Sequence, residues 1–491
     1  MDEQERQRRR EAMREQRRKK VQRQRRILLI ICGILLLGLI GGIGFGVKAL
    51  GNRREAKTIG KIADQSYEQF LEQNHLQKDC SKEDSKDDSK GRKKKKEEES
   101  FGVWLTKQYP EQVKDKSLSK VLEDGELTSE ESYQVLGMTM HVLKDVYEGH
   151  LGDVKAAKKQ NIYTSETFPY VAGKKEPVKV SIAGDLCLEE DGFVLDHYDE
   201  VGTLEKCISS EILKITNEAD IFYLNHEYTV GNRGEALPGK LYTFQAEPER
   251  MKLLQEMGTD LVSLANNHVY DYGEVGLLDT LQYLDEAKIP YVGGGRNIEE
   301  AKRPIYFVEN GVKIGFVAAS NAELTLYTPA ATEDTPGIME AYDTTEYNKM
   351  IKEASRNCDY LIAYIHWGPE DVNQYADYQT TQGKEFLDAG ADIVVGGHPH
   401  VLQGMEYMDG KPVIYSMGDF WFNHETKYTG LLNLEISNQG LVEMSFTPCL
   451  QTGFTTQYLE TQEEQREMFD FMESLSPNIS IDDAGVITEL K

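Results

Sequence analysis

Apolar residues gather into six short runs between residues 178 and 420, and each run ends directly in polar or ionisable residues. The six read VKVSIAGD, DIFYLNHE, DLVSLANNH, DYLIAYIHW, DIVVGGHPH and VIYSMGDF. Runs of this length without surface alternation predict strands that are buried on both faces. Amphipathic segments with helical spacing lie between them, at residues 204–218, 247–257, 274–287, 344–356 and 379–389. We therefore predict an α/β domain over residues 177–450, in which helices cover the faces of the sheet.

The polar residues that follow these strands form one candidate site. In α/β folds the ligand lies outside the carboxyl ends of the strands, which is where all six polar clusters fall. Carboxylates, amides and imidazoles together suit one or two divalent ions such as manganese, iron or zinc. Two such ions bridged by a carboxylate would activate water and hold a phosphoryl or acyl oxygen. The residues concerned are Asp185, Asn225, His226, Glu227, Asn266, Asn267, His268, His366, His398, His400 and Asp419.

Each of these residues also has a structural explanation when it is taken singly. Asp185 could cap a helix, and His366 could be a hydrogen-bonded core histidine. Asn266 and Asn267 are also common in turns. Capping and turns do not explain why six strand ends carry such residues at once, so we favour a metal site. His226 should face away from its neighbours if the chain is extended there, and we leave it out of the site.

An apolar segment near the N-terminus predicts a membrane anchor. Ile27–Val47 read ILLIICGILLLGLIGGIGFGV, 21 residues without a charge. At helical rise this length spans the hydrocarbon core of a bilayer, which predicts a transmembrane helix. The run is longer than the apolar core of a usual signal peptide, and no A-x-A cleavage site follows it. Residues 1–26 hold 12 Lys/Arg and 5 Asp/Glu, so we expect a cytoplasmic basic head and an extracytoplasmic body.

Charge and apolar spacing divide the remaining chain. Residues 48–100 should form a juxtamembrane helix and then a disordered linker, because 78–100 is low-complexity charge with little to bury. Residues 101–176 regain apolar side chains and should form a small helical stalk, with helical spacing over Ser129–Tyr147. Residues 451–491 form an acidic tail that could pack on the α/β domain or hang free.

Charge and cysteine content narrow the functional classes. The whole chain carries a formal charge of −27, although its basic head is positive. So acidic a body repels polyanions unless cations intervene, which disfavours nucleic acid as a partner. The six cysteines include no CxxC pair. Buried or incidental thiols are therefore favoured over a disulfide framework.

The polar clusters stand in motifs that resemble a known family. GD at 184–185, NHE at 225–227, LANNHVYDYG at 264–273, HWG at 366–368, GGHPHVLQG at 396–404 and YSMGDF at 415–420 resemble the bacterial CapA-like capsule-synthesis family, as does GGGRNIEEAKRPI at 293–305. The resemblance spans about residues 178–422. That family is associated with poly-gamma-glutamate production and is similar to calcineurin-type metallophosphoesterases. The resemblance implies a layered α/β/β/α sandwich.

Carried over residue by residue, the resemblance implies a role for individual positions. Glu227 would bridge two ions. His268 would be the catalytic histidine, which stabilises charge on the substrate or protonates the leaving group. The implied metal ligands are Asp185, Glu227, Asn267, His366, His398 and His400.

Three positions depart from the family pattern. Phosphoesterases open with Asp-x-His, but position 187 is Cys, and Glu227 stands where their second motif has Asp. Both changes predict that one ion is bound more weakly or is absent. Asp419 stands where the family reads Asn. Asp419 should either bind the metal itself or accept a hydrogen bond from a residue that binds it.

Two functions fit these expectations, both in capsule or poly-gamma-glutamate synthesis or export at the cell membrane. The first is a membrane-anchored, extracytoplasmic metal-dependent hydrolase that acts on a phosphoester or an amide-linked polymer. The second is a non-catalytic scaffold or polymer-binding partner of a membrane synthase, with a vestigial metal site. The expected partners are the membrane, a polymer synthase complex, and poly-gamma-glutamate or another cell-surface polymer. Bound metal would discriminate between the two functions.

Overall fold

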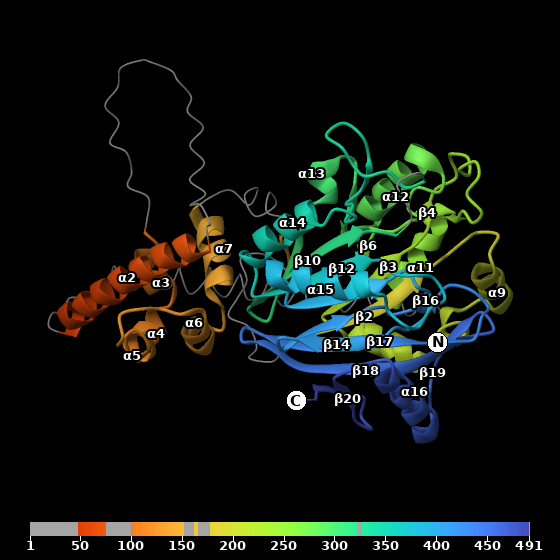
Figure 1. The fold of residues 1–491 in the computed structure, drawn as a ribbon. Coiled ribbons are helices and arrows are strands. Elements are labelled where there is room, and N and C mark those ends of the chain that lie inside the picture. The colour runs from red at the N-terminus through yellow and green to blue at the C-terminus, as the bar shows by residue number, and fades with distance from the viewer. Residues whose placement is uncertain (1–47, 75–99, 152–161, 165–176, 323–326, 491) are drawn as a thin grey trace, which may run out of the picture. The chain divides into compact units, whose positions relative to one another are not determined.

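The computed structural model describes residues 48–74, 100–151, 162–164, 177–322 and 327–490 (Figure 1). The predicted transmembrane helix at 27–47, the basic head and most of the charged linker lie outside the described residues. Among the helices of the described part, none combines the length and the apolar character that a membrane span needs. The chain divides into two compact units. Unit 1 holds residues 1–175 and 308–313, and unit 2 holds residues 176–307 and 314–491.

Unit 1 is built from helices that pack around an aromatic core. The rings of Tyr67 and Phe101 stack at 4.4 Å between centroids, and Trp104 lies 5.7 Å from Phe101. Helices α2 and α3 approach closely where Gly60 meets Gly102, because neither residue has a Cβ. A Cβ on Gly102 would overlap the main-chain oxygen of Gly60. The elements are α2 (Lys48–Gln73), α3 (Phe101–Gln108), α4 (Pro110–Lys114), α5 (Ser117–Val121), α6 (Ser129–Leu136), α7 (Met140–Leu151) and the short strand β1 (Ile162–Thr164).

The helical spacing over Ser129–Tyr147 is split between two helices. Gly137 has a φ of 73°, and its N–H donates to the main-chain oxygen of Tyr133, which ends α6. Such a left-handed glycine cap is a common helix end. Thr128 begins α6 in a capping box with Glu131. Periodicity alone did not separate the two helices, because the apolar spacing continues across the glycine.

A hairpin tip from the second half of the chain completes unit 1. Residues 308–313 belong to this unit, and Val308 joins its apolar cluster. The N–H of Thr139 donates to the main-chain oxygen of Gly311. Lys313 Nζ lies 2.8 Å from Asp145 Oδ2, and the two side chains are only 4% and 1% exposed. This unit therefore contains a buried ion pair between α7 and the hairpin.

The first sheet of unit 2 holds the strand that precedes Asp185. Its order is β19-β18-β17-β2-β3-β6-β7, and β16 pairs with β2. The β2-β3-β6-β7 half and the β16–β2 pair are parallel, whereas β17, β18 and β19 are antiparallel. The strands are β2 (Val178–Leu186), β3 (Ile221–His226), β6 (Leu261–Ser263), β7 (Tyr291–Val292), β16 (Asp419–Trp421), β17 (Lys427–Ser437), β18 (Gly440–Thr452) and β19 (Thr455–Tyr458).

The second sheet carries the strands that precede His366 and the HPH sequence at 398–400. Within unit 2 it runs in the order β9-β10-β12-β13-β15-β14. The neighbours from β10 to β15 are parallel, and β14 pairs antiparallel with β15. The strands are β9 (Ile305–Glu309), β10 (Val312–Ser320), β12 (Tyr360–His366), β13 (Ile393–Gly397), β14 (Met405–Met408) and β15 (Lys411–Ile414).

The two sheets pack face to face, with helices outside. The ring of Tyr223 on β3 lies 5.5 Å from Phe316 on β10 and 5.8 Å from Tyr364 on β12. Helices α9 (Phe193–Val201), α10 (Ser210–Glu218), α11 (Met251–Met257) and α12 (Gly273–Ala287) share a core with the first sheet, and α14 (Thr345–Ser355) and α15 (Asp377–Ala389) contact the second. The predicted α/β class is confirmed, and helices occur in all five predicted segments.

The remaining elements of unit 2 are short or lie after residue 450. They are β4 (Thr229–Val230), β5 (Gln245–Ala246), β8 (Gly294–Gly295), β11 (Gly337–Ile338), α13 (Ile298–Ala301), η1 (Leu204–Lys206), η2 (Pro248–Arg250), α16 (Gln462–Ser474), β20 (Ile479–Ile481) and β21 (Ile487–Glu489). The sheet continues past residue 450 through β18 and β19. Met468, Phe469 and Met472 of α16 are buried, and Phe446 donates its N–H to the oxygen of Gly485. The tail packs on the domain because α16 has an apolar face to bury.

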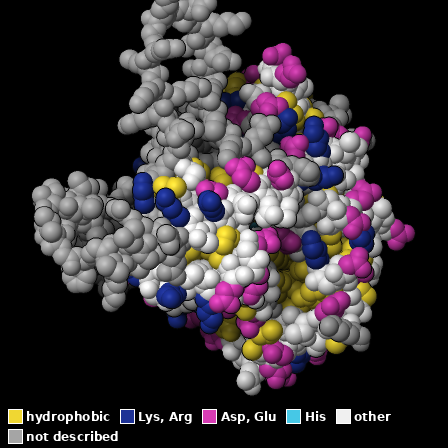
Figure 2. All heavy atoms as spheres, turned by 90° about the vertical axis from the view of Figure 1, so that its left-hand side faces the viewer, with side chains coloured by type: hydrophobic (Ala, Val, Ile, Leu, Met, Phe, Trp, Pro, Cys, Tyr) yellow, Lys and Arg dark blue, Asp and Glu magenta, His cyan; other side chains and the backbone are white. Residues whose placement is uncertain are grey.

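One face of the surface carries both signs of charge, and the described cysteines are buried. Acidic and basic side chains lie intermixed on the face that Figure 2 presents. The described cysteines Cys187, Cys207, Cys358 and Cys449 are buried free thiols, as predicted for a fold that rests on an apolar core.

Candidate metal centre

The strand ends of both sheets bring the candidate side chains to one place. At the end of β2, Asp185 lies opposite Asn225 of β3 and Asp419 of β16 in the pairing register. At the end of β12, His366 pairs with the last residue of β13, after which the turn at 398–400 begins. Parallel strands end at the same edge of a sheet, so the sheet topology creates this cluster.

Ligand-type atoms converge in three overlapping groups. In each group, one atom from every residue lies within 4.8 Å of the others. Asn267 adjoins them, because its Oδ1 lies 2.9 Å from His366 Nε2. All six side chains that the resemblance implies as ligands therefore meet, and Asp419 meets them too. The groups are Glu227 with His398 and His400, Asp185 with Glu227 and His366, and Asp185 with His400 and Asp419.

The turn that carries two of the histidines has a strained backbone. The φ angle is 95° at His398 and 56° at His400, in the region that residues with a side chain avoid. The N–H of His398 donates to Asp185 Oδ2 at 3.0 Å. Gly397 precedes the turn, and a Cβ there would overlap the hydroxyl of Tyr364. Strain of this kind persists where the surroundings hold it, and it concentrates at functional sites.

Two carboxylates lie buried side by side in this cluster. Burial raises the pKa of Asp185 to about 6, and the charge of Glu227 adds to the effect. Burial also raises the pKa of Glu227 to about 7. Asn225 Nδ2 donates to Asp185 Oδ1 at 2.8 Å and to Glu227 Oε2 at 3.1 Å. Two buried carboxylates this close are unfavourable unless a proton or a metal ion offsets their charge.

The two histidines of the turn have different charge environments. Burial by itself lowers the pKa of His400, but Asp419 and Glu227 outweigh it and raise the pKa to about 10. His400 Nδ1 lies 2.8 Å from Asp419 Oδ1, which leaves Nε2 on the side of Glu227, 3.9 Å from its Oε1. Burial, and then His366 and His400, hold the pKa of His398 well below its usual range. His398 is therefore neutral, which is the form that binds metal.

Buried atoms of this cluster test whether a metal ion fits. Among the described residues, Glu227 Oε1 and His398 Nδ1 of this cluster have no hydrogen-bond partner. Buried polar atoms normally have partners, so such atoms in one cluster call for a ligand. Carboxylate oxygens, amide oxygens and imidazole nitrogens are suitable ligands for a divalent ion. The residues present therefore fit one or two ions.

His268 lies beside the metal ligands, outside the three groups. Its Nδ1 is 2.7 Å from Asp271 Oδ2, and its ring lies 4.4 Å from that of Phe244. The imidazole is 8% exposed. Because Asp271 occupies Nδ1, Nε2 is the nitrogen that can exchange a proton with a substrate.

The sequence reasoning missed two residues that support His268. Asp271 stands three residues after His268 within a motif already singled out, so its spacing was an available signal. Lys240 gave none, because it lies in a loop far from any strand end. Its Nζ lies 2.9 Å from Asp271 Oδ1.

Cys187, a departure from the family pattern, and His226, which was left out of the site, both lie outside the ligand groups of the described residues. Cys187 lies outside the ligand groups that the described residues form, and burial raises the pKa of its thiol. It is therefore an uncharged thiol where phosphoesterases have a histidine. His226 also lies outside these groups, and its ring stacks on Tyr228 at 3.8 Å.

Comparison with known proteins assigns the family. Residues 179–424, half of the chain, match the family described as "Bacterial capsule synthesis protein PGA_cap". The chain belongs to the PGA_cap family. It is 31% identical over 295 residues to the PGA biosynthesis protein CapA of Bacillus subtilis, which covers 56% of this chain and 75% of that one. It is 32% identical over 213 residues to the capsule biosynthesis protein CapA of Bacillus anthracis, which covers 41% of this chain and 50% of that one.

A solved structure gives a weaker likeness to the chain. The NAD nucleotidase NadN of Haemophilus influenzae matches with a TM-score of 0.33 and 15% identity, covering 62% of this chain and 64% of that one. A likeness at this level carries no argument about activity.

We expect manganese to stabilise the PGA_cap domain more at about pH 7.5 than at about pH 5. The folded pKa values of Asp185 and Glu227 are raised above their ordinary values of 3.8 and 4.5. In the metal-free protein these two groups therefore contribute stability at low pH, which is lost as the pH rises through about 6 to 7. An ion that binds the ionised carboxylates reverses the loss. Thermal unfolding with and without manganese at both pH values measures this, and an equal gain at both would contradict it.

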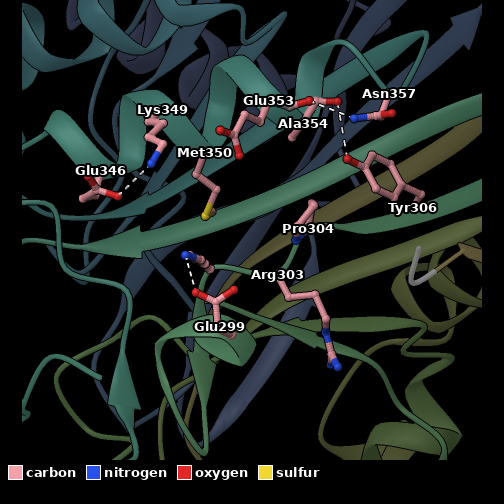
Figure 3. A pocket seen from close by; sticks show the side chains of 11 residues that line it. Glu299, Arg303, Pro304, Tyr306, Glu346, Lys349, Met350, Glu353, Ala354 and Asn357 are labelled. Carbon is pink, nitrogen blue, oxygen red and sulfur yellow. Dashed lines mark hydrogen bonds and ion pairs between the residues drawn. The ribbon is translucent and has the colours of Figure 1, made fainter. Parts of the chain in front are cut away.

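The PGA_cap domain also has a pocket of about 300 Å³ between α13, β9 and α14 (Figure 3). Four of its charged side chains form two pairs. Lys302 Nζ lies 2.5 Å from Glu299 Oε1, and Lys349 Nζ lies 3.9 Å from Glu346 Oε2. The lining residues come from elements other than those that end at the metal centre, so we assign this pocket no part in the site.

Proposed function

We propose that this protein is a metal-dependent hydrolase that acts in capsule or poly-gamma-glutamate synthesis or export. The observation that supports it most is the convergence of buried carboxylates and imidazoles, among which Glu227 Oε1 and His398 Nδ1 lack hydrogen-bond partners. A purely structural cluster would satisfy these atoms internally, because unsatisfied buried polar groups are costly. The family assignment supports the biological setting.

The residues of the centre divide into ligands and a proton-transfer group. One or two ions of manganese, iron or zinc would be held by Asp185, Glu227, Asn267, His366, His398 and His400, and bound metal would activate water and polarise a phosphoryl or acyl oxygen. Asp419 orients His400 through Nδ1, as carboxylates behind metal-bound histidines do. Asp271 orients His268, whose Nε2 exchanges a proton with the substrate.

The cellular setting follows from the N-terminal sequence and from the relatives. We propose that residues 27–47 anchor the chain in the cell membrane, with the basic head in the cytoplasm and the α/β domain outside. Relatives named for capsule and PGA biosynthesis support a place beside a polymer synthase. Poly-gamma-glutamate or another cell-surface polymer would then be the material on which the protein acts.

A second candidate function is a non-catalytic scaffold or polymer-binding partner of the synthase. The observation that favours it is Cys187, an uncharged buried thiol at the position where phosphoesterases supply a histidine ligand. A centre without that imidazole would hold one ion less tightly. The names of the relatives also describe biosynthesis and no hydrolysis.

Metal content and turnover of the full-length chain, purified in detergent, discriminate between the two. We expect near-stoichiometric metal, and manganese-dependent hydrolysis of bis(p-nitrophenyl) phosphate or p-nitrophenyl phosphate. Chelation should abolish both, and added manganese should restore them. Bound metal without turnover of these esters or of poly-gamma-glutamate would favour the scaffold. Absence of both metal and turnover would refute the hydrolase.

A further inference from the structure

Lys240 is a buried cation in a loop that is otherwise exposed. The loop joins β4 to β5, and its residues Leu241 and Tyr242 are 83% and 65% exposed. The side chain of Lys240, which directly precedes them in the sequence, is only 4% exposed. Ammonium groups are costly to bury, so a loop on the surface would normally leave its lysine in water.

The buried ammonium contacts two residues of the candidate site at once. Lys240 Nζ donates to the main-chain oxygen of Asn267. It also lies 2.9 Å from Asp271 Oδ1. The other carboxylate oxygen of Asp271 is 2.7 Å from His268 Nδ1. One cation thus links the main chain of an implied metal ligand to the carboxylate that orients the proton-transfer histidine.

Asp271 also binds the loop that contains Lys240, through its carboxylate and through its main chain. Phe244 donates its N–H to Asp271 Oδ2 at 2.8 Å, and Leu237 donates its N–H to the main-chain oxygen of Asp271 at 2.9 Å. The phenyl ring of Phe244 packs on the ring of His268. Residues on both sides of Lys240 are therefore tied to Asp271, so the loop and the histidine adopt one common arrangement.

A second segment contacts both the loop and Asn267. The hydroxyl of Tyr327 donates to the main-chain oxygen of Gly239 at 3.0 Å, and the ring of Tyr327 lies 6.0 Å from Lys240 Nζ. The hydroxyl of Thr328 donates to the main-chain oxygen of Asn267 at 2.7 Å. That oxygen thus accepts from both Thr328 and Lys240, which provides an internal comparison between a neutral donor and a charged one.

We propose that Lys240 is a positioning residue for the hydrolytic reaction: its ammonium, which also donates to the main-chain oxygen of Asn267, holds Asp271 so that His268 keeps one fixed geometry. The proposal rests on the proposed function, because it assigns Lys240 a part in that reaction. It acts through Asp271, and because it contacts only the main chain of Asn267, it leaves the metal-ligand atoms unchanged. The loop around it places Leu241 and Tyr242 outside the same site, exposed to solvent.

Lys240→Met tests the assignment in the full-length protein. With manganese saturating, we expect the kcat for bis(p-nitrophenyl) phosphate to fall about 10- to 100-fold, as for other groups that orient active-site residues. KM and the manganese Kd should each change less than about threefold, because the metal ligands remain. Lys240→Gln, which keeps a donor without the charge, is tested beside it as a second, more conservative variant.

Two comparison variants separate positioning from general packing. Thr328→Val removes the neutral donor to the Asn267 oxygen and should lower kcat less than about threefold. Lys252→Met removes a lysine that lies over Tyr198 on another part of the domain, and it should leave kcat unchanged. If Thr328→Val reduces kcat as much as Lys240→Met does, anchoring of the carbonyl explains the effect and the proposal is overturned.

A spectroscopic readout keeps this test separate from the test of hydrolysis. The proton shared by His268 Nδ1 and Asp271 should give a downfield proton resonance in the metal-free protein, which His268→Ala removes. We expect Lys240→Met to shift or broaden it and Thr328→Val to preserve it. If the wild type has this resonance but no turnover, the proposed function fails. The resonance of Lys240→Met then still shows whether Lys240 holds Asp271 against His268. An unchanged resonance and unchanged kcat in Lys240→Met would overturn the positioning role.

Discussion

Glu227→Gln should lower the turnover of phosphodiester substrates at least about 1000-fold, which corresponds to roughly 4 kcal/mol of lost transition-state stabilisation. Glu227, Asp185 and His400 each belong to two of the three ligand groups, and among them Glu227 is the residue that the resemblance implies as the bridge between two ions. Glutamine has the same size, and it can still accept from Asn225, which now donates to Glu227 Oε2. Its NH2 group would then point at the ions and repel them. Metal bound per chain should fall by at least one ion.

Mass spectrometric metal analysis and steady-state kinetics of the purified variant measure both effects. Glu189→Gln is the matched control, because Glu189 is a half-buried carboxylate near Cys187 that lies outside the ligand groups of the described residues. We expect it to keep the metal and to change kcat less than about threefold. Full metal content and full turnover in Glu227→Gln would show that this residue neither bridges nor binds an ion.

Asp145→Ala should destabilise unit 1 by about 3–5 kcal/mol, because it leaves a buried ammonium without its counter-charge. Asp145 Oδ2 lies 2.8 Å from Lys313 Nζ, and Lys144 Nζ lies 3.8 Å from Asp145 Oδ1. All three side chains are at most 6% exposed. The double variant Asp145→Ala/Lys313→Met replaces the buried pair with apolar groups. It should recover part of the lost stability, because Lys144 stays buried without Asp145.

Hydrogen exchange as a function of denaturant measures the free energy of opening within each unit, which a single unfolding midpoint would not resolve. Amides of α7 and of residues 308–313 should exchange faster in Asp145→Ala, while those of the first sheet of unit 2 keep their protection. Glu435→Ala is the control, because it breaks a surface pair with Lys179 at 4.0 Å and should cost less than about 1 kcal/mol. A loss no larger than that control in Asp145→Ala would mean that the buried pair does not stabilise unit 1.

The strands and the candidate ligands were predictable because burial imposes a simple pattern. A strand covered on both faces needs a continuous apolar run, and polar residues directly after the run stand at its carboxyl end. Asp185, His366 and the turn at 398–400 could be assigned in this way. The helices were predictable for a similar reason, since one face of each packs on a sheet and the other meets water.

Long-range packing hid other parts of the structure from this reasoning. Lys240 carries a common surface side chain in a polar loop, and only the position of Asp271 turns it inward. The hairpin tip at 308–313 belongs to a unit whose other residues end at 175. The two segments are far apart in the sequence, so no local pattern predicts that they pack together. Gly137 divided a continuous helical pattern because a left-handed residue changes the chain direction without changing the apolar spacing.

The sequence by itself determined the α/β class, the places of six strands and five helical segments, the apolar segment at 27–47 and the residue types available for a metal centre. These properties depend on local apolar spacing and on which residues follow each strand. Both can be read from neighbouring residues in the sequence. Only the tertiary structure decided that Asp185 lies beside Asp419, that Cys187 lies outside the ligand groups of the described residues, and that Lys240 holds Asp271. Those facts depend on strand register and on loop packing between residues distant in sequence. Such contacts form only when the two sheets and their loops assemble.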